Sequence, residues 1–285
     1  MMDNRCRIGV YEKAIPEEYS LREMLAFAKE AGYDYFEISI DRTPQRIDRL
    51  YSPEYIAQAA QAIRETGIPI GAVCLSALGT YTLGSPDAET EAKALDIFSH
   101  ALAFARELHI PIIQLPACDM GKFDPRDEDT DRRFLANLKR ITRMAAGEGI
   151  LLGLENMEND YMDSVSKCMR AVDEVASPYL QLYVDAGNIT SAMKLQGGSI
   201  EEDMRTGDGH YIAFHLKETQ PGRYGGLFYG EGHADFVNTV AHVYAQGVRR
   251  YTMEYWYTGN PDWRGDMVRA RELCRGWIAA AAERN

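Results

Sequence analysis

Eight short apolar segments, separated by longer amphipathic ones, constrain the fold of this sequence more than any other feature. Each apolar segment is rich in β-branched or aromatic residues and is apolar on both faces, which is typical of a parallel strand covered on both sides. We predict strands at 6–12, 35–40, 71–76, 112–117, 151–156, 180–185, 211–218 and 251–256. The chain therefore carries material for one sheet of eight strands.

The intervening segments place apolar residues at intervals of three and four, which predicts amphipathic helices. These helices are expected at 20–32, 52–67, 87–109, 130–149, 164–176, 234–247 and 262–284, with a weaker pattern at 199–209. Ser52-Pro53 and Ser85-Pro86 predict helix starts with Ser as the N-cap and Pro as the first helical residue. Glycines at the ends of several segments predict helix termini, and they are Gly32, Gly67, Gly149 and Gly247.

Eight repeats of strand and helix predict an α/β fold, a single (β/α)₈ TIM-barrel domain that spans residues 1–285. An open doubly wound sheet is the alternative, because it is built from the same units. The count of eight and the absence of a G-x-G-x-x-G motif after the first strand favour the barrel. The length also suits a barrel, since such domains commonly reach this size as one unit.

Charge and composition exclude several classes of protein. The chain has 31 basic and 43 acidic residues, a net charge of −12, and no basic run, so nucleic acid is not an expected partner. No apolar run is long enough to cross a membrane, and the first residues carry no signal-peptide pattern. Five dispersed cysteines without a C-x-x-C pair predict reduced thiols and a cytoplasmic location.

Four consecutive predicted strands each carry one potential metal ligand at or near the C-terminal end. The four are Glu155, Asp185, His215 and Glu254, and we call them the carboxylate–histidine cluster. Barrel enzymes build their active sites at the C-terminal ends of the strands, so these side chains are expected to share one mouth. Three carboxylates and an imidazole suit one divalent ion, Mn²⁺, Zn²⁺, Co²⁺ or Mg²⁺. Taken singly, each could instead be a solvent-facing acid or a satisfied core group.

Several other polar residues could contact a substrate or an anion. Lys217 lies two residues after His215, so its side chain is expected on the same face, where it could bind a substrate oxygen or phosphate or neutralise the acids. The loop Gly230-Glu231-Gly232, with Arg223 nearby, could hold a phosphate through its backbone N–H groups, although an ordinary turn is the commoner outcome.

The remaining polar residues at strand ends are Glu12, Asp41, Ser76 and Asp119, and most of them are expected to form salt-bridged scaffolding. His233, in the loop after the seventh predicted strand, could approach a substrate, but we interpret it as an ordinary loop residue. His210 precedes that strand, which places it at the opposite end of the barrel.

Motifs along nearly the whole chain resemble one group of enzymes. The stretches are IGVYEKAIP at 8–16, FEISID at 36–41, CLSA and LGS within 74–85, IQLPACD at 113–119, RRF at 132–134, LENMENDYMDSVSK at 154–167, QLYVDAGN at 181–188, HLKET at 215–219, GEGHADF at 230–236 and MEYW at 253–256. In order and coverage they resemble the L-ribulose-5-phosphate 3-epimerases (L-xylulose-5-phosphate 3-epimerases) of the xylose-isomerase-like barrel superfamily.

The resemblance implies that the carboxylate–histidine cluster holds the metal, since related epimerases use these positions. It also implies a homodimer or homotetramer. Asn188 stands where free-ketose epimerases place a His three residues after the Asp, which favours a phosphorylated substrate. Leu78 stands where the sugar-phosphate branch is expected to carry a His, which points the other way.

The expected reaction is inversion at C3 of a ketose through an ene-diolate, with Glu155 and Glu254 as the two proton-transferring groups. Lys217, Asn188 and Arg223 are predicted substrate contacts, and Trp256 is predicted to wall the pocket. A free-ketose 3-epimerase, an aldose–ketose isomerase and a hydroxypyruvate isomerase are alternatives on the same metal site. An endonuclease-IV-like phosphodiesterase needs more histidine ligands and a basic face, and a sugar sensor would not need the intact ligand set.

Overall fold

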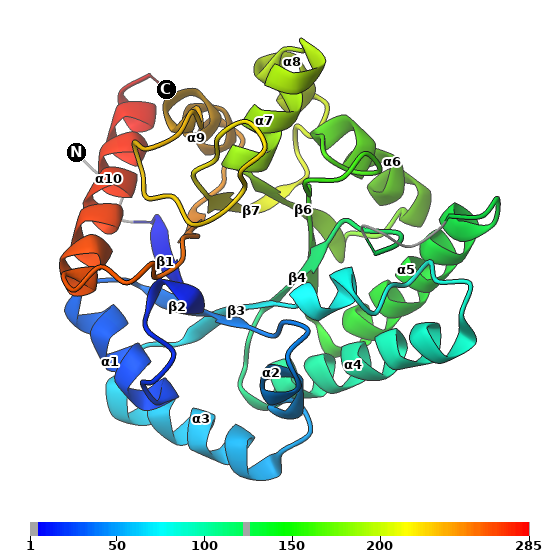
Figure 1. The fold of residues 1–285 in the computed structure, drawn as a ribbon, viewed down its shortest axis with the longest axis horizontal. Helices are drawn as coiled ribbons and strands as arrows, with labels where there is room; N and C mark the ends of the chain where they lie inside the picture. The colour runs from blue at the N-terminus through cyan, green and yellow to red at the C-terminus, as the bar shows by residue number, and fades with distance from the viewer. Residues whose placement is uncertain (1–4, 122–125, 285) are drawn as a thin grey trace.

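In a computed structural model that describes residues 5–121 and 126–284, eight parallel strands close into a barrel (Figure 1). They are β1 Arg7–Tyr11, β2 Tyr35–Ser39, β3 Ile70–Cys74, β4 Ile112–Pro116, β5 Leu151–Glu155, β6 Leu180–Asp185, β7 Tyr211–Leu216 and β8 Arg250–Met253. Each strand pairs with the next in the chain, and β1 closes the ring against β8 where Val10 lies opposite Met253. The predicted (β/α)₈ TIM barrel is confirmed.

Helices form an outer ring around this sheet (Figure 1). The α-helices are α1 Leu21–Glu30, α2 Pro44–Asp48, α3 Pro53–Thr66, α4 Ala88–Glu107, α5 Thr130–Glu148, α6 Val165–Val175, α7 Ala186–Gln196, α8 Ile200–Arg205, α9 Phe236–Ala245 and α10 Trp263–Arg284. Two 3₁₀ turns, η1 Glu12–Ala14 and η2 Ser76–Gly79, follow β1 and β3. All eight predicted helical segments are present, the weak one as α8. None of the helices in the described residues combines the length and apolarity that crossing a membrane requires.

The helix-start signals give one correct prediction and one correction. Ser52 caps α3 as predicted, and Gly67 ends that helix in a left-handed conformation with φ +72°. The predicted start of α4 is wrong by two residues. The cap is Asp87, whose carboxylate accepts the N–H of Thr90, whereas Ser85 lies outside the helix and accepts the N–H of Asp87. A carboxylate cap before Ala88 takes precedence over the Ser-Pro signal.

Helix α7, which follows β6 without a loop, escaped the sequence analysis. All residues from 186 to 193 are buried, polar ones included, so most of the helix lacks the exposed polar face that marks an amphipathic helix. Its N-cap is Asp185, whose Oδ1 accepts the N–H of Asn188 at 2.7 Å. The last residue of β6 therefore both starts a helix and faces the mouth of the barrel.

Two tyrosine rings fill the interior of the barrel below its mouth. Tyr35 and Tyr183 are almost fully buried. Their rings lie against glycines of neighbouring strands: a Cβ at Gly153 would come within 2.7 Å of the Tyr183 Cβ, and one at Gly9 would collide with the Tyr35 ring. The glycines thus make room for aromatic side chains that support the mouth from beneath.

Candidate active site

The carboxylate–histidine cluster assembles at the mouth as a compact group. One ligand atom from each of its four residues lies within 4.8 Å of the others, and all four side chains are buried. Nδ1 of His215 is 2.8 Å from Glu155 Oε1 and 3.0 Å from Glu254 Oε2. Four side chains that are distant in the sequence thus surround one point.

Strand register explains why these side chains meet. Asp185 of β6 lies opposite His215 of β7, which in turn lies opposite Thr252 of β8. Residues opposite each other in parallel strands point to the same face, and the next inward position on β8 is Glu254. The N–H of Glu254 donates to the Leu216 carbonyl at 3.0 Å, which continues the pairing beyond the end of β8.

Two carboxylate oxygens of the cluster lack hydrogen-bond donors. Asp185 uses Oδ1 to cap α7, and its buried Oδ2 has no partner. Oε2 of Glu254 also has no hydrogen-bond partner, although Nδ1 of His215, which contacts Glu155 at 2.8 Å, lies 3.0 Å away. Buried carboxylate oxygens without donors are unfavourable unless a cation satisfies them. The donor set therefore fits a divalent ion with oxygen and imidazole ligands.

The pKa shifts in the cluster reflect burial together with the charges of the neighbouring acids and cations. Burial raises the pKa of Asp185 to about 8, although Lys217 opposes the rise. Burial also acts to raise the pKa of Glu254, but Lys217 and His215 outweigh it and lower the pKa to about 2. For His215, burial acts to lower the pKa, but the surrounding carboxylates raise it well above its usual value. Additional positive charge at this point would stabilise the ionised acids.

A cavity of about 490 Å³ opens over the cluster. Its walls come from the ends of most strands and from the loop after β7: Tyr11, Lys13, Cys74, Ser76, Pro116, Glu155, Met157, Glu158, Lys217, Tyr224, Gly225, Glu254 and Trp256. The Tyr11 and Trp256 rings meet edge to face, with centroids 6.0 Å apart. The cavity has the size of a small-molecule site and combines aromatic walls with a few polar groups.

The residues predicted to contact a substrate fall into two sets. Lys217 and Trp256 line the cavity, and the Lys217 ammonium lies 3.7 Å from Asp185 and 3.9 Å from Glu254. Asn188 is buried behind the cluster, where its amide donates to the Asn156 carbonyl at 2.8 Å.

Arg223 lies on an exposed loop and donates to the backbone carbonyls of Gly225 and Gly226, so it does not line the cavity. His233 is likewise outside the cavity, and its Nε2 lies 3.0 Å from the Ser191 hydroxyl.

The glycine loop at 230–232, predicted as an anion site or a turn, is bound by a carboxylate of the protein itself. Glu218, at the end of the β7 region, accepts the N–H groups of Gly230 and Ala234 at 3.0 and 2.9 Å. A Cβ at Gly232 would collide with Glu218, so the carboxylate packs tightly against this loop. The turn interpretation is therefore confirmed, because a side chain of the protein occupies the donors.

Sequence reasoning missed two polar residues that support the cluster from within the sheet. Gln114 in β4 donates its amide to Glu155 Oε2, and Glu37 in β2 lies 2.6 Å from Nε2 of His215. Both are fully buried in otherwise apolar strands. That position is the signal that could have found them, since a buried polar side chain in mid-strand needs a partner inside the barrel.

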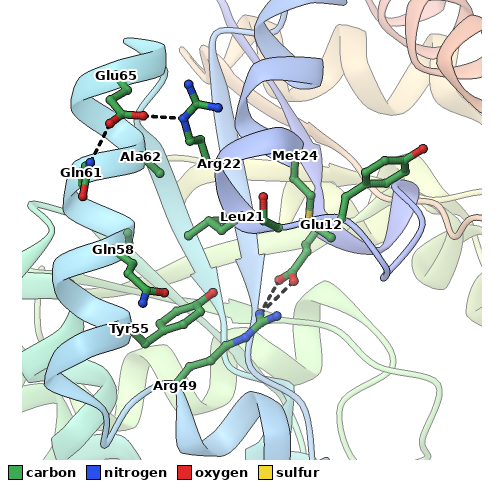
Figure 2. Close-up of a pocket in the computed structure, with 13 residues that line it drawn as sticks. Glu12, Leu21, Arg22, Met24, Arg49, Tyr55, Gln58, Gln61, Ala62 and Glu65 are labelled. Carbon is green, nitrogen blue, oxygen red and sulfur yellow. Dashed lines mark hydrogen bonds and ion pairs between the residues drawn. The ribbon is translucent and has the colours of Figure 1, made fainter.

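The acids at the other strand ends are ion-paired, as predicted. Glu12 faces Arg49 at 2.8 Å and Arg46 at 2.9 Å, and Figure 2 shows the pair with Arg49 in the wall of a cavity between α1 and α3. Asp41 is paired with Lys13 at 2.7 Å. Asp119 is paired with Arg126 at 2.7 Å. Ser76, by contrast, lines the cavity over the cluster.

Comparison with known proteins identifies the family. The family model of the xylose isomerase-like TIM barrel matches residues 25–277. The chain is 32% identical over 283 residues to the L-ribulose-5-phosphate 3-epimerase UlaE of Shigella sonnei (strain Ss046), a match that covers 99% of this chain and 98% of that one. The chain belongs to the L-ribulose-5-phosphate 3-epimerase family of xylose isomerase-like barrels. The resemblance inferred from the motifs is confirmed.

Solved structures show the same fold at lower identity. An L-ribulose 3-epimerase matches with a TM-score of 0.77 and 19% identity, covering 98% of this chain and 96% of that one. The 3-keto-D-glucoside 4-epimerase YcjR from E. coli matches with a TM-score of 0.72 and 21% identity, covering 94% and 99%. These likenesses establish the barrel. The names of the relatives agree with the predicted isomerase class.

Proposed function

We propose that the protein is a metal-dependent ketose-phosphate 3-epimerase that interconverts L-ribulose 5-phosphate and L-xylulose 5-phosphate. The observation that carries the proposal is the convergence of the carboxylate–histidine cluster on one point beneath an open cavity. The choice of substrate is supported by relatives named L-ribulose-5-phosphate 3-epimerase, which match almost the full length of the chain.

The cluster would hold one divalent ion, Mn²⁺, Zn²⁺, Co²⁺ or Mg²⁺. The donor-free oxygens of Asp185 and Glu254 support this assignment. Bound there, the ion would polarise the ketose carbonyl and stabilise the negative charge that develops on the substrate oxygens.

Glu155 and Glu254 are the proposed proton-transferring residues. Both line the cavity, and they reach it from β5 and from the end of β8, with two strands between them. One carboxylate would remove the proton from C3, and the other would deliver a proton to the opposite face. The amide of Gln114 holds Glu155 in place by donating to its Oε2. Proton transfer by positioned groups contributes roughly 10²–10⁴-fold to a rate.

Lys217 and Trp256 are the proposed substrate contacts. The Lys217 ammonium sits beside Asp185 and Glu254, where it can donate to a substrate oxygen while it balances the acids. Trp256 supplies an apolar wall that positions the carbon chain. We assign Asn188 a supporting role, because its amide fixes the Asn156 backbone behind the cluster. The geometry lends no support to the predicted contact with Arg223.

An epimerisation assay in D₂O tests the proposal. Purified protein loaded with Mn²⁺ is given L-ribulose 5-phosphate, and deuterium at C3 and the products are followed by NMR. We expect deuterium at C3 and formation of L-xylulose 5-phosphate, both lost on chelation and restored by Mn²⁺. No exchange at C3 by a fully metal-loaded protein would contradict the proposal.

The free-ketose alternative rests on one observation. Leu78, buried in η2 next to the cavity-lining Ser76, stands where a His is expected for a phosphorylated substrate. The same assay with unphosphorylated L-ribulose separates the two substrates. Faster turnover of the free ketose would retain the metal site and the two carboxylates but would exclude the phosphate specificity. Exchange at C1 in place of C3 would indicate an aldose–ketose isomerase.

We also propose that residues 1–285 form one domain, and that copies of it assemble as a homodimer or homotetramer. Light scattering on the purified chain measures the number of copies.

A further inference from the structure

Glu37 lies inside the barrel directly behind His215. Its side chain is fully buried in β2, and Oε1 is 2.6 Å from Nε2 of His215. The other oxygen, Oε2, accepts hydrogen bonds from the Tyr183 hydroxyl at 2.7 Å and from Thr252 Oγ1 at 3.1 Å. Both carboxylate oxygens are therefore satisfied, and each has a separate partner.

The hydroxyl groups around Glu37 form a closed network. The Tyr183 and Thr252 hydroxyls are 2.7 Å apart, and the Tyr35 hydroxyl is 2.8 Å from Thr252. The Tyr183 ring also packs against the His215 ring, with centroids 4.5 Å apart. Because both tyrosine rings depend on glycines in neighbouring strands, the barrel interior is shaped to hold this network. The Glu37 carboxylate consequently has a fixed position.

The two nitrogens of His215 have different surroundings. Nε2 faces Glu37, whereas Nδ1 faces Glu155 and lies in the carboxylate–histidine cluster. A ring that keeps its hydrogen on Nε2 has its lone pair on Nδ1, and the hydrogen bond at one nitrogen sets which nitrogen is free for a metal.

We propose that Glu37 is a positioning residue for the metal centre: it accepts the Nε2 hydrogen of His215 and so holds Nδ1 toward the ion. Tyr183 and Thr252 hold the carboxylate in turn. The inference rests on the metal centre of the proposed function. It goes beyond that function, because it states that a residue outside the ligand set raises the affinity of the centre for its metal. Glu37 itself touches neither the cavity nor the point on which the ligands converge.

Two substitutions at Glu37 separate this role from a purely structural one. Glu37→Leu removes the acceptor for His215, whereas Glu37→Gln retains a neutral amide oxygen as a weaker acceptor. Glu12→Gln is the matched control: Glu12 is a similarly buried carboxylate at the end of the adjacent strand, but its partners are Arg46, Arg49 and the N–H of Ser39. Loss of such a residue affects stability without touching His215.

The measurement is the affinity of the metal-free proteins for Mn²⁺, by competition with a chelating dye, with folding checked by urea titration. Loss of a partner that orients a ligating histidine weakens metal binding by roughly 10–100-fold. We expect that loss for Glu37→Leu, a smaller loss for Glu37→Gln and wild-type affinity for Glu12→Gln. The visible absorption of bound Co²⁺ reports ligand geometry. Among the three variants, it should change most in Glu37→Leu.

Wild-type Mn²⁺ affinity in both Glu37 variants would overturn the proposal. If Glu37→Leu fails to fold, Glu37→Gln decides, and an affinity equal to that of Glu12→Gln would overturn it equally. Absence of Mn²⁺ binding by the wild-type protein would instead refute the metal centre itself, so the two failures are distinguishable.

Discussion

The mouth of this barrel has two halves that use the same residue types for different purposes. At the ends of β1, β2 and β4, the acids Glu12, Asp41 and Asp119 are each paired with Arg or Lys. At the ends of β5 to β8, three carboxylates surround one histidine, and two of their oxygens have no donor. The first half is electrostatically complete by itself, whereas the second has acids in excess of its cations.

The difference shows that position at a strand end does not by itself identify a functional acid. In both halves the acid is buried or nearly so and lies at the C-terminal end of a parallel strand. What separates them is the partner: the acids of the first half are held by Arg or Lys side chains and by neighbouring N–H or O–H groups, whereas His215 and Lys217 leave two carboxylate oxygens of the cluster without a donor. The incomplete half is where an ion and a substrate are expected.

Removal of metal should have the largest effect of any treatment. We expect a chelator to abolish epimerisation and to lower the melting temperature, because an ion that binds only the folded state stabilises it by about 2.7 kcal/mol at 100 times its Kd. Activity with and without EDTA and thermal unfolding in the same buffers measure both effects. Full activity after verified removal of metal would contradict the proposal that the half at β5 to β8 requires an ion.

Glu155→Gln and Glu254→Gln should each lower kcat by roughly 10²–10⁴-fold, the range for a lost proton-transferring group. The fold should remain, because the amide is similar in size to the carboxylate. Steady-state kinetics with L-ribulose 5-phosphate and Mn²⁺ in excess measure the effect. A variant with bound metal and near wild-type kcat would exclude that residue as one of the two bases.

Glu12→Gln probes the complete half of the mouth. It breaks a buried ion pair with Arg46 and Arg49, and removal of one partner from such a pair destabilises by about 3–5 kcal/mol. We expect a value near the lower end, since both arginines are partly exposed. Urea unfolding measures the loss. Unchanged stability together with weakened Mn²⁺ binding would contradict this assignment, because it would show that Glu12 supports the metal site and not the ion-paired half of the mouth.

Arg126→Ala should have the smallest effect. The arginine is 44% exposed, although its partner Asp119 is buried. Pairs that contact water contribute up to about 1 kcal/mol, and the Met120 N–H continues to satisfy Asp119. A loss of several kcal/mol in urea unfolding would show that this pair is as important for stability as that of Glu12.

The barrel and the four cluster residues could be predicted because each strand end is recognisable from a few residues, and because the barrel topology brings these ends together. An apolar strand that ends in an acid is visible in a few residues, as in the LLGLEN stretch that contains Glu155. Consecutive parallel strands then bring such ends to one mouth. No contact needed to be known in advance.

Glu37 and α7 could not be predicted in the same way. The partner of Glu37, His215, is 178 residues away in the sequence. The two residues come into contact only because the barrel closes, so the sequence near Glu37 gives no sign of its role. Helix α7 is buried on all sides over residues 186–193, which removes the amphipathic pattern. The position of Arg223 could not be predicted either, because the conformation of its loop, not its proximity in sequence, directs the guanidinium to nearby carbonyls.

The most direct test of the central claim is the metal content of wild-type protein and of Asp185→Asn after dialysis against the same free Mn²⁺. Asparagine caps helices as well as aspartate does, so α7 should keep its start while the ion loses a charged ligand. The account predicts one ion per chain in the wild type and far less in the variant. Equal loading of the two proteins, or no loading of the wild type, would contradict it.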